Sequence, residues 1–204
     1  MADATSNILS GPEVLAGYAS AIGKKKAESP AWTLFLLGIV AGLMIGLGAV
    51  AAGTASHAVD NVGLARMISG LLFPFGLAMV MLMGSELFTG NTMIFISVLD
   101  RKATVAGMLK NWTCVYFGNM AGSLLLAAGM VYSGQLNLGG GSLAVYVIKT
   151  AISKCSLSFG PAVILGILCN ILVCLGVLCS LAAKDVTGRI LGAYIPVVFL
   201  SSGA

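Results

Sequence analysis

Gly84-Ser85-Glu86-Leu87-Phe88-Thr89-Gly90-Asn91-Thr92 is a polar, glycine-rich stretch between two apolar runs. Residues 71–83 before it and residues 93–99 after it carry no charged side chain. A bilayer tolerates irregular backbone only where protein buries it or water reaches it, and an acidic side chain at such depth is usually functional. The stretch therefore predicts an interrupted membrane helix that lines a path or a site. The alternative is a plain turn between two short helices at the membrane surface.

The composition of the chain is that of a membrane protein. Of its 204 residues, 58% are hydrophobic and 9% are charged, whereas soluble domains are about 25% charged. The net charge of +4 is modest, and no basic patch with interleaved aromatic residues indicates nucleic acid binding. Residues 1–26 are polar and lack the apolar core of a signal peptide. We therefore expect an all-α polytopic membrane protein that inserts through its first membrane helix.

The cysteine and histidine residues do not suggest a metal centre or a catalytic site. No Cys-x-x-Cys pair occurs, and the sole histidine, His57, falls in a predicted loop. Metal-ligand clusters of the usual spacing are therefore missing, as is a nucleophile with an adjacent base. We expect no metal, no cofactor and no enzymatic activity, and we interpret the cysteines as small buried apolar residues.

Two parts are expected along the chain. Residues 1–29 are predicted to form a cytoplasmic, interfacial helix that starts at Ser10-Gly11-Pro12-Glu13, where a proline and an acid mark a helix N-terminus. Residues 30–204 are predicted to form a transmembrane channel domain that is incomplete at its C-terminal end. The apolar face of the interfacial helix contains Val14, Leu15, Tyr18 and Ile22.

Membrane helices are assigned from apolar runs of about 20 residues, the length that crosses a bilayer. The interrupted stretch divides the second span into two pieces, since residues 91–99 are too short to cross alone. A short interfacial helix is expected at residues 143–152. The predicted spans are residues 31–55, 66–99, 108–132 and 159–183, with the start of a fifth at residues 190–204.

The spans form an internal repeat. Leu37-Gly38-Ile39 and Leu47-Gly48 match Leu165-Gly166-Ile167 and Leu175-Gly176 at the same internal spacing. The second span matches the fifth, because Ile68, Gly70 and Pro74 correspond to Ile190, Gly192 and Pro196. Three spans separate the copies, so the sequence predicts an inverted repeat of three-helix units, as in many channels and transporters. A second break is expected after Phe199, at residues 201–203, with the substrate path between the two breaks.

The basic residues are distributed unequally between the two sides of the predicted membrane domain. Cytoplasmic loops carry an excess of lysine and arginine, so the richer side should be cytoplasmic. The N-terminus would then lie inside the cell, and the protein would lie in the inner (plasma) membrane. Eight basic residues fall on that side, Lys24, Lys25, Lys26, Arg101, Lys102, Lys110, Lys184 and Arg189, and three on the other, Arg66, Lys149 and Lys154.

Several motifs together resemble the formate/nitrite transporter family, and within it the sequence is most similar to the hydrosulfide channel branch. The resemblance covers nearly the whole chain. It implies a homopentamer with a separate anion pore in each protomer. It also implies an aquaporin-like inverted repeat with six spans, of which the second and fifth are broken. The motifs are residues 84–91, Lys110-Asn111-Trp112, Tyr116-Phe117-Gly118-Asn119, Leu165-Gly166-Ile167-Leu168-Cys169-Asn170 and Pro196-Val197-Val198-Phe199.

The resemblance also implies which residues form the substrate pathway. Thr89 matches a pore-facing threonine of the interrupted helix, Lys154 a lysine near the outer start of the fourth span, and Asn170 a pore-facing asparagine. Glu86 and Asn91 are predicted to support the loop, with Glu86 accepting hydrogen bonds from backbone N–H groups. The residues that match apolar constrictions at two levels are Phe73, Leu77, Leu87, Phe88 and Phe199.

Ordinary structural roles remain open for several of these residues. Lys154 is otherwise a loop lysine, Thr89 a side chain bonded to its own helix carbonyl, and the aromatic residues plain packing. After the Ser-Gly of the fifth span the family continues with a Glu-His pair and a sixth span, whereas the sequence given ends at Ala204. Either the sequence given stops short, or the pore histidine and the closing helix are missing.

The expected function is the passage of small monovalent anions, of the hydrosulfide, formate and nitrite class, through the lipid bilayer. A bare charge in an apolar constriction is costly. We therefore expect Lys154 to attract the anion, which then takes up a proton and crosses as the neutral acid. The alternatives are an aquaporin-like neutral-solute pore, a proton-coupled formate or nitrite carrier, a membrane-embedded enzyme and a structural subunit. The preferred anion, the choice between channel and carrier, and gating stay open.

Overall fold

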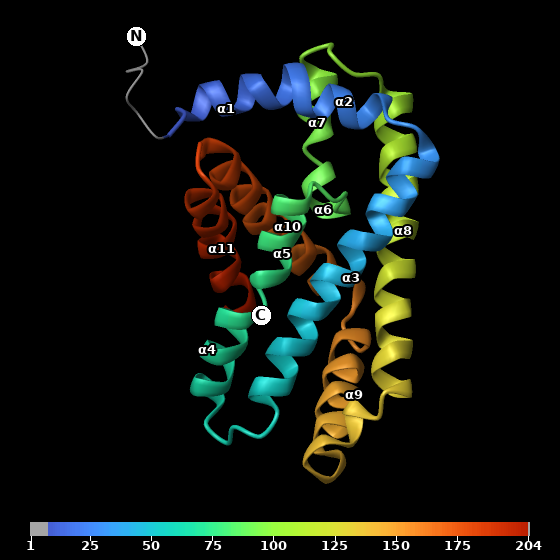
Figure 1. The fold of residues 1–204 in the computed structure, drawn as a ribbon, viewed down its shortest axis with the longest axis vertical. Helices are drawn as coiled ribbons and strands as arrows, with labels where there is room; N and C mark the ends of the chain where they lie inside the picture. The colour runs from blue at the N-terminus through green and yellow to red at the C-terminus, as the bar shows by residue number, and fades with distance from the viewer. Residues whose placement is uncertain (1–7, 204) are drawn as a thin grey trace.

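The computed structural model describes the backbone of residues 8–203 and the side chains up to Phe199. Almost all of these residues are helical, as predicted (Figure 1). In chain order the helices are α1 Gly11–Gly17, the π-helix η1 Tyr18–Ile22, α2 Gly23–Glu28, α3 Ala31–Ser56, α4 Val62–Leu72, α5 Phe75–Met83, α6 Phe88–Asn91, α7 Ile94–Leu99, α8 Val105–Tyr132, the 3-10 helix η2 Gln135–Gly141, α9 Ser142–Cys155, α10 Phe159–Ala182 and α11 Val186–Gly203.

Within the described residues, four helical segments are long and apolar enough to cross a bilayer. Two of them begin earlier than predicted because Asn61 and Thr104 cap them, each accepting a hydrogen bond from the backbone N–H three residues later. The interfacial helix is also longer than predicted, since α9 extends over Ser142–Cys155. The four segments correspond to the four predicted spans, the second of them to the part before the interruption: Ala31–Ser56, Val62–Met83, Val105–Tyr132 and Phe159–Ala182.

The first and third spans, α3 and α8, pack along one another (Figure 1). Gly38 and Gly42, which belong to a row of glycines at every fourth position of α3, face the backbone of α8 around Gly118 and Asn119. A Cβ atom on Gly42 would collide with the carbonyl group of Asn119. Small side chains on this face therefore allow the close approach of the two backbones that is typical of membrane helix pairs.

The second span is interrupted where the sequence predicts. α5 is followed by Gly84, whose φ of +65° lies in the left-handed region that glycine adopts without strain. Residues 85–87 are not helical, and the short helices α6 and α7 complete the span. A further bend, which the sequence analysis missed, separates α4 from α5 at Phe73 and Pro74. Proline has no N–H group to continue the helical hydrogen bonds, so the helix changes direction there.

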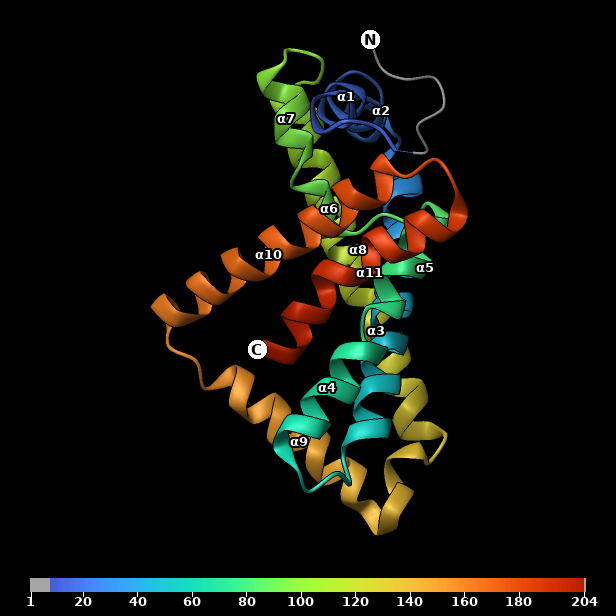
Figure 2. The same ribbon diagram turned by 90° about the vertical axis from the view of Figure 1, so that its left-hand side faces the viewer.

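The fourth span and the following helix, α10 and α11, pack against each other as the second unit of the repeat (Figure 2). Gly176 of α10 faces the backbone of Ala193 in α11, just as Gly48 of α3 faces the backbone at Gly76 in α5. Each of the two matched glycines therefore lies against the backbone of the helix that follows in its own unit. Figure 2 also shows α10 diverging from the α3–α8 pair toward α9.

The second break is not found at the predicted place. The backbone of α11 stays helical through residues 201–203, where the sequence analysis placed the interruption. The repeat itself explains the difference. Gly84 follows Pro74 by ten residues, and Pro196 is the counterpart of Pro74, so the counterpart of Gly84 would come after position 204.

The N-terminal segment forms a nearly continuous helix, α1–η1–α2, that crosses one end of the molecule (Figure 1). Val14 and Tyr18 of its predicted apolar face are buried, and Ile22 is partly buried. Leu15 is exposed, so its assignment to that face was wrong; it lies about 100° around the helix from Val14. The residues of the main core cluster are Tyr18, Leu77, Met93, Val173, Val177, Ala193 and Val197.

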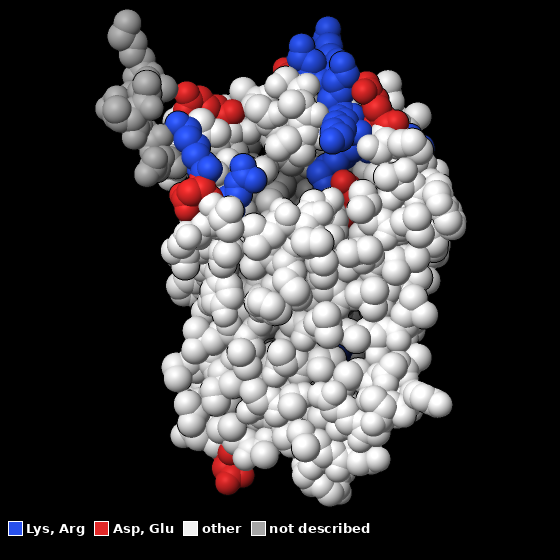
Figure 3. Space-filling model, in the orientation of Figure 1, with Lys and Arg blue, Asp and Glu red and all other residues white. Residues whose placement is uncertain are grey.

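Charged side chains gather at the same end. Lysine and arginine cover the region of α1 and α2 and the loops that follow α7 and α10, while the long middle of the visible face is uncharged (Figure 3). The loop after α7 contains Arg101 and Lys102. The loop after α10 contains Lys184, and Arg189 lies nearby at the start of α11. This arrangement agrees with the predicted division of basic residues between the two sides of a membrane.

Candidate functional site

A cavity of about 450 Å³ reaches the interruption of the second span. Its upper wall comes from η1, α2 and the start of α3, and its deeper wall from α5, α10 and the interrupted stretch. The interruption is therefore open to a cavity on the side of α2. The lining residues are Tyr18, Ile22, Lys25, Lys26, Ser29, Thr33, Leu37, Leu77, Val80, Met81, Gly84, Ser85, Glu86, Leu87, Gly90, Asn91, Val177 and Leu181.

An ion pair joins the N-terminal helix to the interruption. Lys26 Nζ lies 2.8 Å from Glu86 Oε2, and it also donates a hydrogen bond of 2.9 Å to Asn91 Oδ1. The side chains are 21% and 10% exposed, so the pair is largely buried at the cavity wall. The prediction that Glu86 accepts hydrogen bonds from backbone N–H groups was wrong, because its carboxylate binds the side chains of Lys26 and Asn91.

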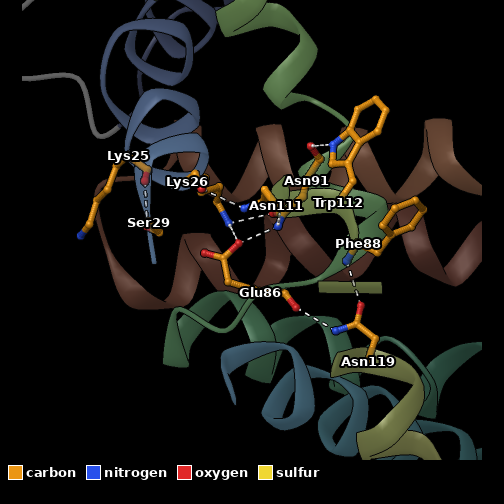
Figure 4. Close-up of polar contacts among 9 residues, drawn as sticks. All are labelled: Lys25, Lys26, Ser29, Glu86, Phe88, Asn91, Asn111, Trp112 and Asn119. Atoms are coloured by element: carbon orange, nitrogen blue, oxygen red, sulfur yellow. Dashed lines mark hydrogen bonds and ion pairs between the residues drawn. The ribbon is translucent and has the colours of Figure 1, made fainter. Parts of the chain in front are cut away.

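Asn91 is the centre of the surrounding network (Figure 4). Its side-chain nitrogen donates to Glu86 Oε2 at 2.6 Å and to Asn111 Oδ1 at 2.8 Å. Asn111 in turn donates to the backbone carbonyl of Lys26 at 3.0 Å. The indole Nε1 of Trp112 donates to the backbone carbonyl of Asn91 at 2.8 Å. The network therefore connects α2, α6 and α8 and satisfies polar groups that would be costly to bury unpaired.

A second asparagine of α8 binds the irregular backbone itself. Asn119 Oδ1 accepts the backbone N–H of Phe88 at 2.9 Å, and its amide nitrogen donates to the carbonyls of Glu86 and Gly38 at 2.9 and 2.8 Å. An interrupted helix leaves backbone groups without helical partners. Asn119 supplies partners to two of them, on Glu86 and Phe88, and its bond to Gly38 of α3 fixes the interruption between α3 and α8 (Figure 4).

A smaller polar group lies between α6 and α10. Asn170 donates a hydrogen bond of 3.0 Å to Thr92 Oγ1, which donates at 2.7 Å to the backbone carbonyl of Thr89. The thiol of Cys174 contacts the same carbonyl at 3.6 Å. Asn170 Oδ1 is buried without a partner among the described residues. Two predicted pathway residues, Thr89 and Asn170, are thus brought together through Thr92.

The geometry can be compared with that of known proteins. Residues 13–204 match the family profile described as formate/nitrite transporter. The chain belongs to the formate/nitrite transporter family. It is 34% identical to the formate channel FocA of Haemophilus influenzae over 97% of this chain and 71% of that protein. It is 32% identical to the formate channel BtFdhC of Bacillus thuringiensis over 92% of this chain and 73% of that protein.

Two solved structures of the formate/nitrite transporter family are similar to this fold. One is a pentameric formate channel with formate bound, with a TM-score of 0.75 and 35% identity, over 87% of this chain and 69% of that one. The other is an FNT family ion channel, with a TM-score of 0.78 and 25% identity, over 95% of this chain and 76% of that one. The chain is therefore a multi-pass membrane protein of a family of anion channels and transporters, and it is not an enzyme.

The structure brings only some of the predicted constriction residues to the cavity. Leu77 and Leu87 line it, and Phe73 packs beside the same core cluster. The ring of Phe88 points away from the cavity, with its centroid 6.4 Å from that of Trp112 and 5.4 Å from that of Tyr116 in α8 (Figure 4). Phe88 therefore packs against two aromatic rings of α8, whereas the apolar wall of the cavity comes from leucine and valine together with Ile22 and Met81. Phe199 is 69% exposed on α11.

Lys154 lies apart from the cavity. It is exposed in the last turn of α9, the helix that precedes α10 in the chain. Among the described residues, no group of three or more histidine, cysteine, aspartate or glutamate side chains is arranged to hold a metal ion.

Sequence analysis missed the functional position of Lys26. Three consecutive lysines were interpreted by their side of the membrane only, although three neighbours on a helix point in three directions about 100° apart. One of them must therefore face the protein. The π-helical turn of η1 adds one residue to the helix. Tyr18 and Lys26 are eight residues apart in the chain, but because of this extra residue their side chains have the relative orientation of residues seven apart in an α-helix. Both consequently face the interruption.

Proposed function

We propose that this protein forms a homopentamer in the plasma membrane and that each protomer passes small monovalent anions of the formate, nitrite and hydrosulfide class. The likeness to a pentameric formate channel and to formate channels of two bacteria supports this proposal. The observation that carries it is the cavity, which leads from Lys25 and Lys26 to the interrupted helix.

The charge of the cavity suits an anion. Its charged lining residues are Lys25, Lys26 and Glu86, so it has one positive charge in excess. Glu86 is held by Lys26 and Asn91, and therefore does not present an uncompensated carboxylate to the permeating ion. A cavity of one sign with low-dielectric walls raises the local concentration of the opposite ion.

The deeper wall of the cavity sets the form in which the substrate crosses. Leu77, Leu87, Val177 and Leu181 are apolar and offer no hydrogen bond to an ion. Moving a bare charge past them is costly, whereas the protonated acid carries no net charge. We propose that the anion collects at the lysines and crosses this apolar region as the neutral acid, with Thr89 and Asn170 on its path.

Lys154 would have the corresponding role on the other side. It is an exposed cation in the last turn of α9, on the side that carries few basic residues. The richer side holds α1 and α2, so the positive-inside rule supports a cytoplasmic N-terminus. Residues 1–29, of which residues 1–7 lie outside the described part of the chain, would then be the cytoplasmic segment with its helix from Gly11, and residues 30–204 the channel domain.

Stopped-flow flux into proteoliposomes tests the proposal. Purified protein is reconstituted, and the uptake of formate, nitrite and hydrosulfide is measured at several external pH values. Uptake of at least one anion should exceed that of protein-free liposomes and rise as the external pH falls, with competition among the anions. Uptake of water or glycerol without any anion flux would favour a neutral-solute pore and contradict the proposal.

A further inference from the structure

The side chain of Tyr18 has an unusual position in the cavity wall. It belongs to η1, the π-helical turn of the N-terminal helix, and it is 1% exposed. Its ring packs in the core cluster with Leu77 and Val177, and all three residues line the cavity. The ring therefore lies where the lysine-lined part of the cavity changes into its apolar part. π-Turns inside α-helices are frequent at functional sites.

The hydroxyl group of Tyr18 has no hydrogen-bond partner among the described residues. Burying an unpaired hydroxyl is costly, and a buried tyrosine usually finds a partner; even the partly buried Tyr146 lies 3.4 Å from Ser56 Oγ. Three other buried side-chain atoms lack partners in the described part of the chain, on Ser97, Asn170 and Ser180. None of those three residues lines the cavity, whereas Tyr18 does.

The surroundings keep the Tyr18 hydroxyl available as a donor. Burial raises the pKa of Tyr18, and the nearby Glu86 and Cys174 side chains raise it further. The group is therefore protonated throughout the physiological range. The hydroxyl makes no hydrogen bond to the carboxylate of Glu86, whose Oε2 atom accepts from Lys26 and Asn91.

We propose that the Tyr18 hydroxyl donates a hydrogen bond to the transported anion, and so forms a binding position for small monovalent oxyanions at the wall of the cavity that η1 provides. The inference rests on the proposed function and names one contact within it. Lys26 uses two of its three ammonium protons on Glu86 and Asn91. Tyr18 thus supplies a neutral donor next to a cation that is largely engaged.

The test compares Tyr18→Phe, which removes only the oxygen atom, with Tyr132→Phe, a matched change at a side chain that is 96% exposed. Formate flux is measured in proteoliposomes over a range of concentrations. Loss of a hydrogen bond to a charged ligand should raise the half-saturating concentration about tenfold for Tyr18→Phe and leave it unchanged for Tyr132→Phe. The formate-dependent rise in melting temperature should shrink in parallel.

Stability without formate distinguishes binding from a structural role. The melting temperature of Tyr18→Phe should equal or exceed that of the parent protein, because the variant no longer buries an unpaired hydroxyl. A lower melting temperature with an unchanged half-saturating concentration would show a structural role and overturn the inference, while the proposed function would stand. Absence of flux of all three anions in the parent protein would overturn the proposed function and the inference together.

Discussion

Replacing Lys26 with methionine removes the ammonium group that joins α2 to the interrupted helix and keeps most of the apolar stem. Two hydrogen bonds are lost, at 2.8 Å to Glu86 and at 2.9 Å to Asn91, and Glu86 keeps its charge without a counter-ion. Breaking a buried ion pair costs about 3–5 kcal/mol. Because the two side chains retain 21% and 10% exposure, we expect about 3 kcal/mol, at the lower limit of that range.

A double-mutant cycle isolates the interaction between the two residues. Glu86→Gln alone should cost about 1.5 kcal/mol, because the amide still accepts a hydrogen bond and Lys26 keeps Asn91. Adding Glu86→Gln to Lys26→Met removes an unpaired charge, so the double variant should be no less stable than Lys26→Met. The coupling energy is then about 1.5 kcal/mol, measured by denaturant unfolding in detergent. Lys24→Met, an exposed neighbour, should change stability by less than about 0.5 kcal/mol.

Hydrogen exchange gives a second measure of the same change. Backbone amides of residues 84–92 should exchange faster in Lys26→Met, because the interruption loses its connection to α2. Additive effects of the two substitutions, with a coupling energy near zero, would refute this part of the argument. So would unchanged exchange of residues 84–92 in Lys26→Met.

Three further predictions concern other parts of the molecule. Gly42→Val should lower the free energy of unfolding by about 3 kcal/mol, because its side chain collides with the Asn119 backbone; thermal melting checks this. Lys154→Ala should lower formate flux several-fold at low substrate, whereas Lys149→Ala should not. Hydrogen bonds from Ser10 lower the pKa of Glu13, so its capping contribution is present above the ordinary glutamate pKa and lost as the pH falls through the lowered value. Hydrogen exchange of the α1 amides should therefore become faster as this contribution is lost at acid pH, and Glu13→Gln should abolish that dependence.

Apolar periodicity and length predicted most of the fold, because the bilayer restricts the chain to helices of nearly fixed length. The interruption was predictable from local chemistry, since Gly84, Ser85 and Glu86 occur where an unbroken helix would be apolar. The bend at Pro74 was missed because α4 and α5 together still form one apolar run. The second break was misplaced because the polar residues Ser201 and Ser202 were taken as the signal of an interruption. The spacing between Pro74 and Gly84 was not applied from the matching Pro196, and it would have placed the break later in the chain.

The contacts of the site could not be predicted in the same way. Lys26 and Glu86 are 60 positions apart in the chain, and nothing local to either residue identifies the other as its partner. Asn111 and Asn119 were recognised as parts of motifs, but the sequence does not show that one binds side chains and the other binds backbone. Phe88 and Leu87 were both assigned to constrictions from the family resemblance, which does not show that their consecutive side chains point in different directions.

Access to Ser85 tests the central claim, that anions pass beside the interruption, most directly. Ser85 lines the cavity and is 6% exposed, and Ser85→Cys changes one atom. We predict that a membrane-impermeant methanethiosulfonate reagent, added on the N-terminal side, modifies this cysteine and blocks formate flux, and that formate slows the reaction. The parent protein and Ser180→Cys, a buried position outside the cavity, should keep their flux under the same treatment. Full modification of Ser85→Cys with undiminished flux would contradict the account.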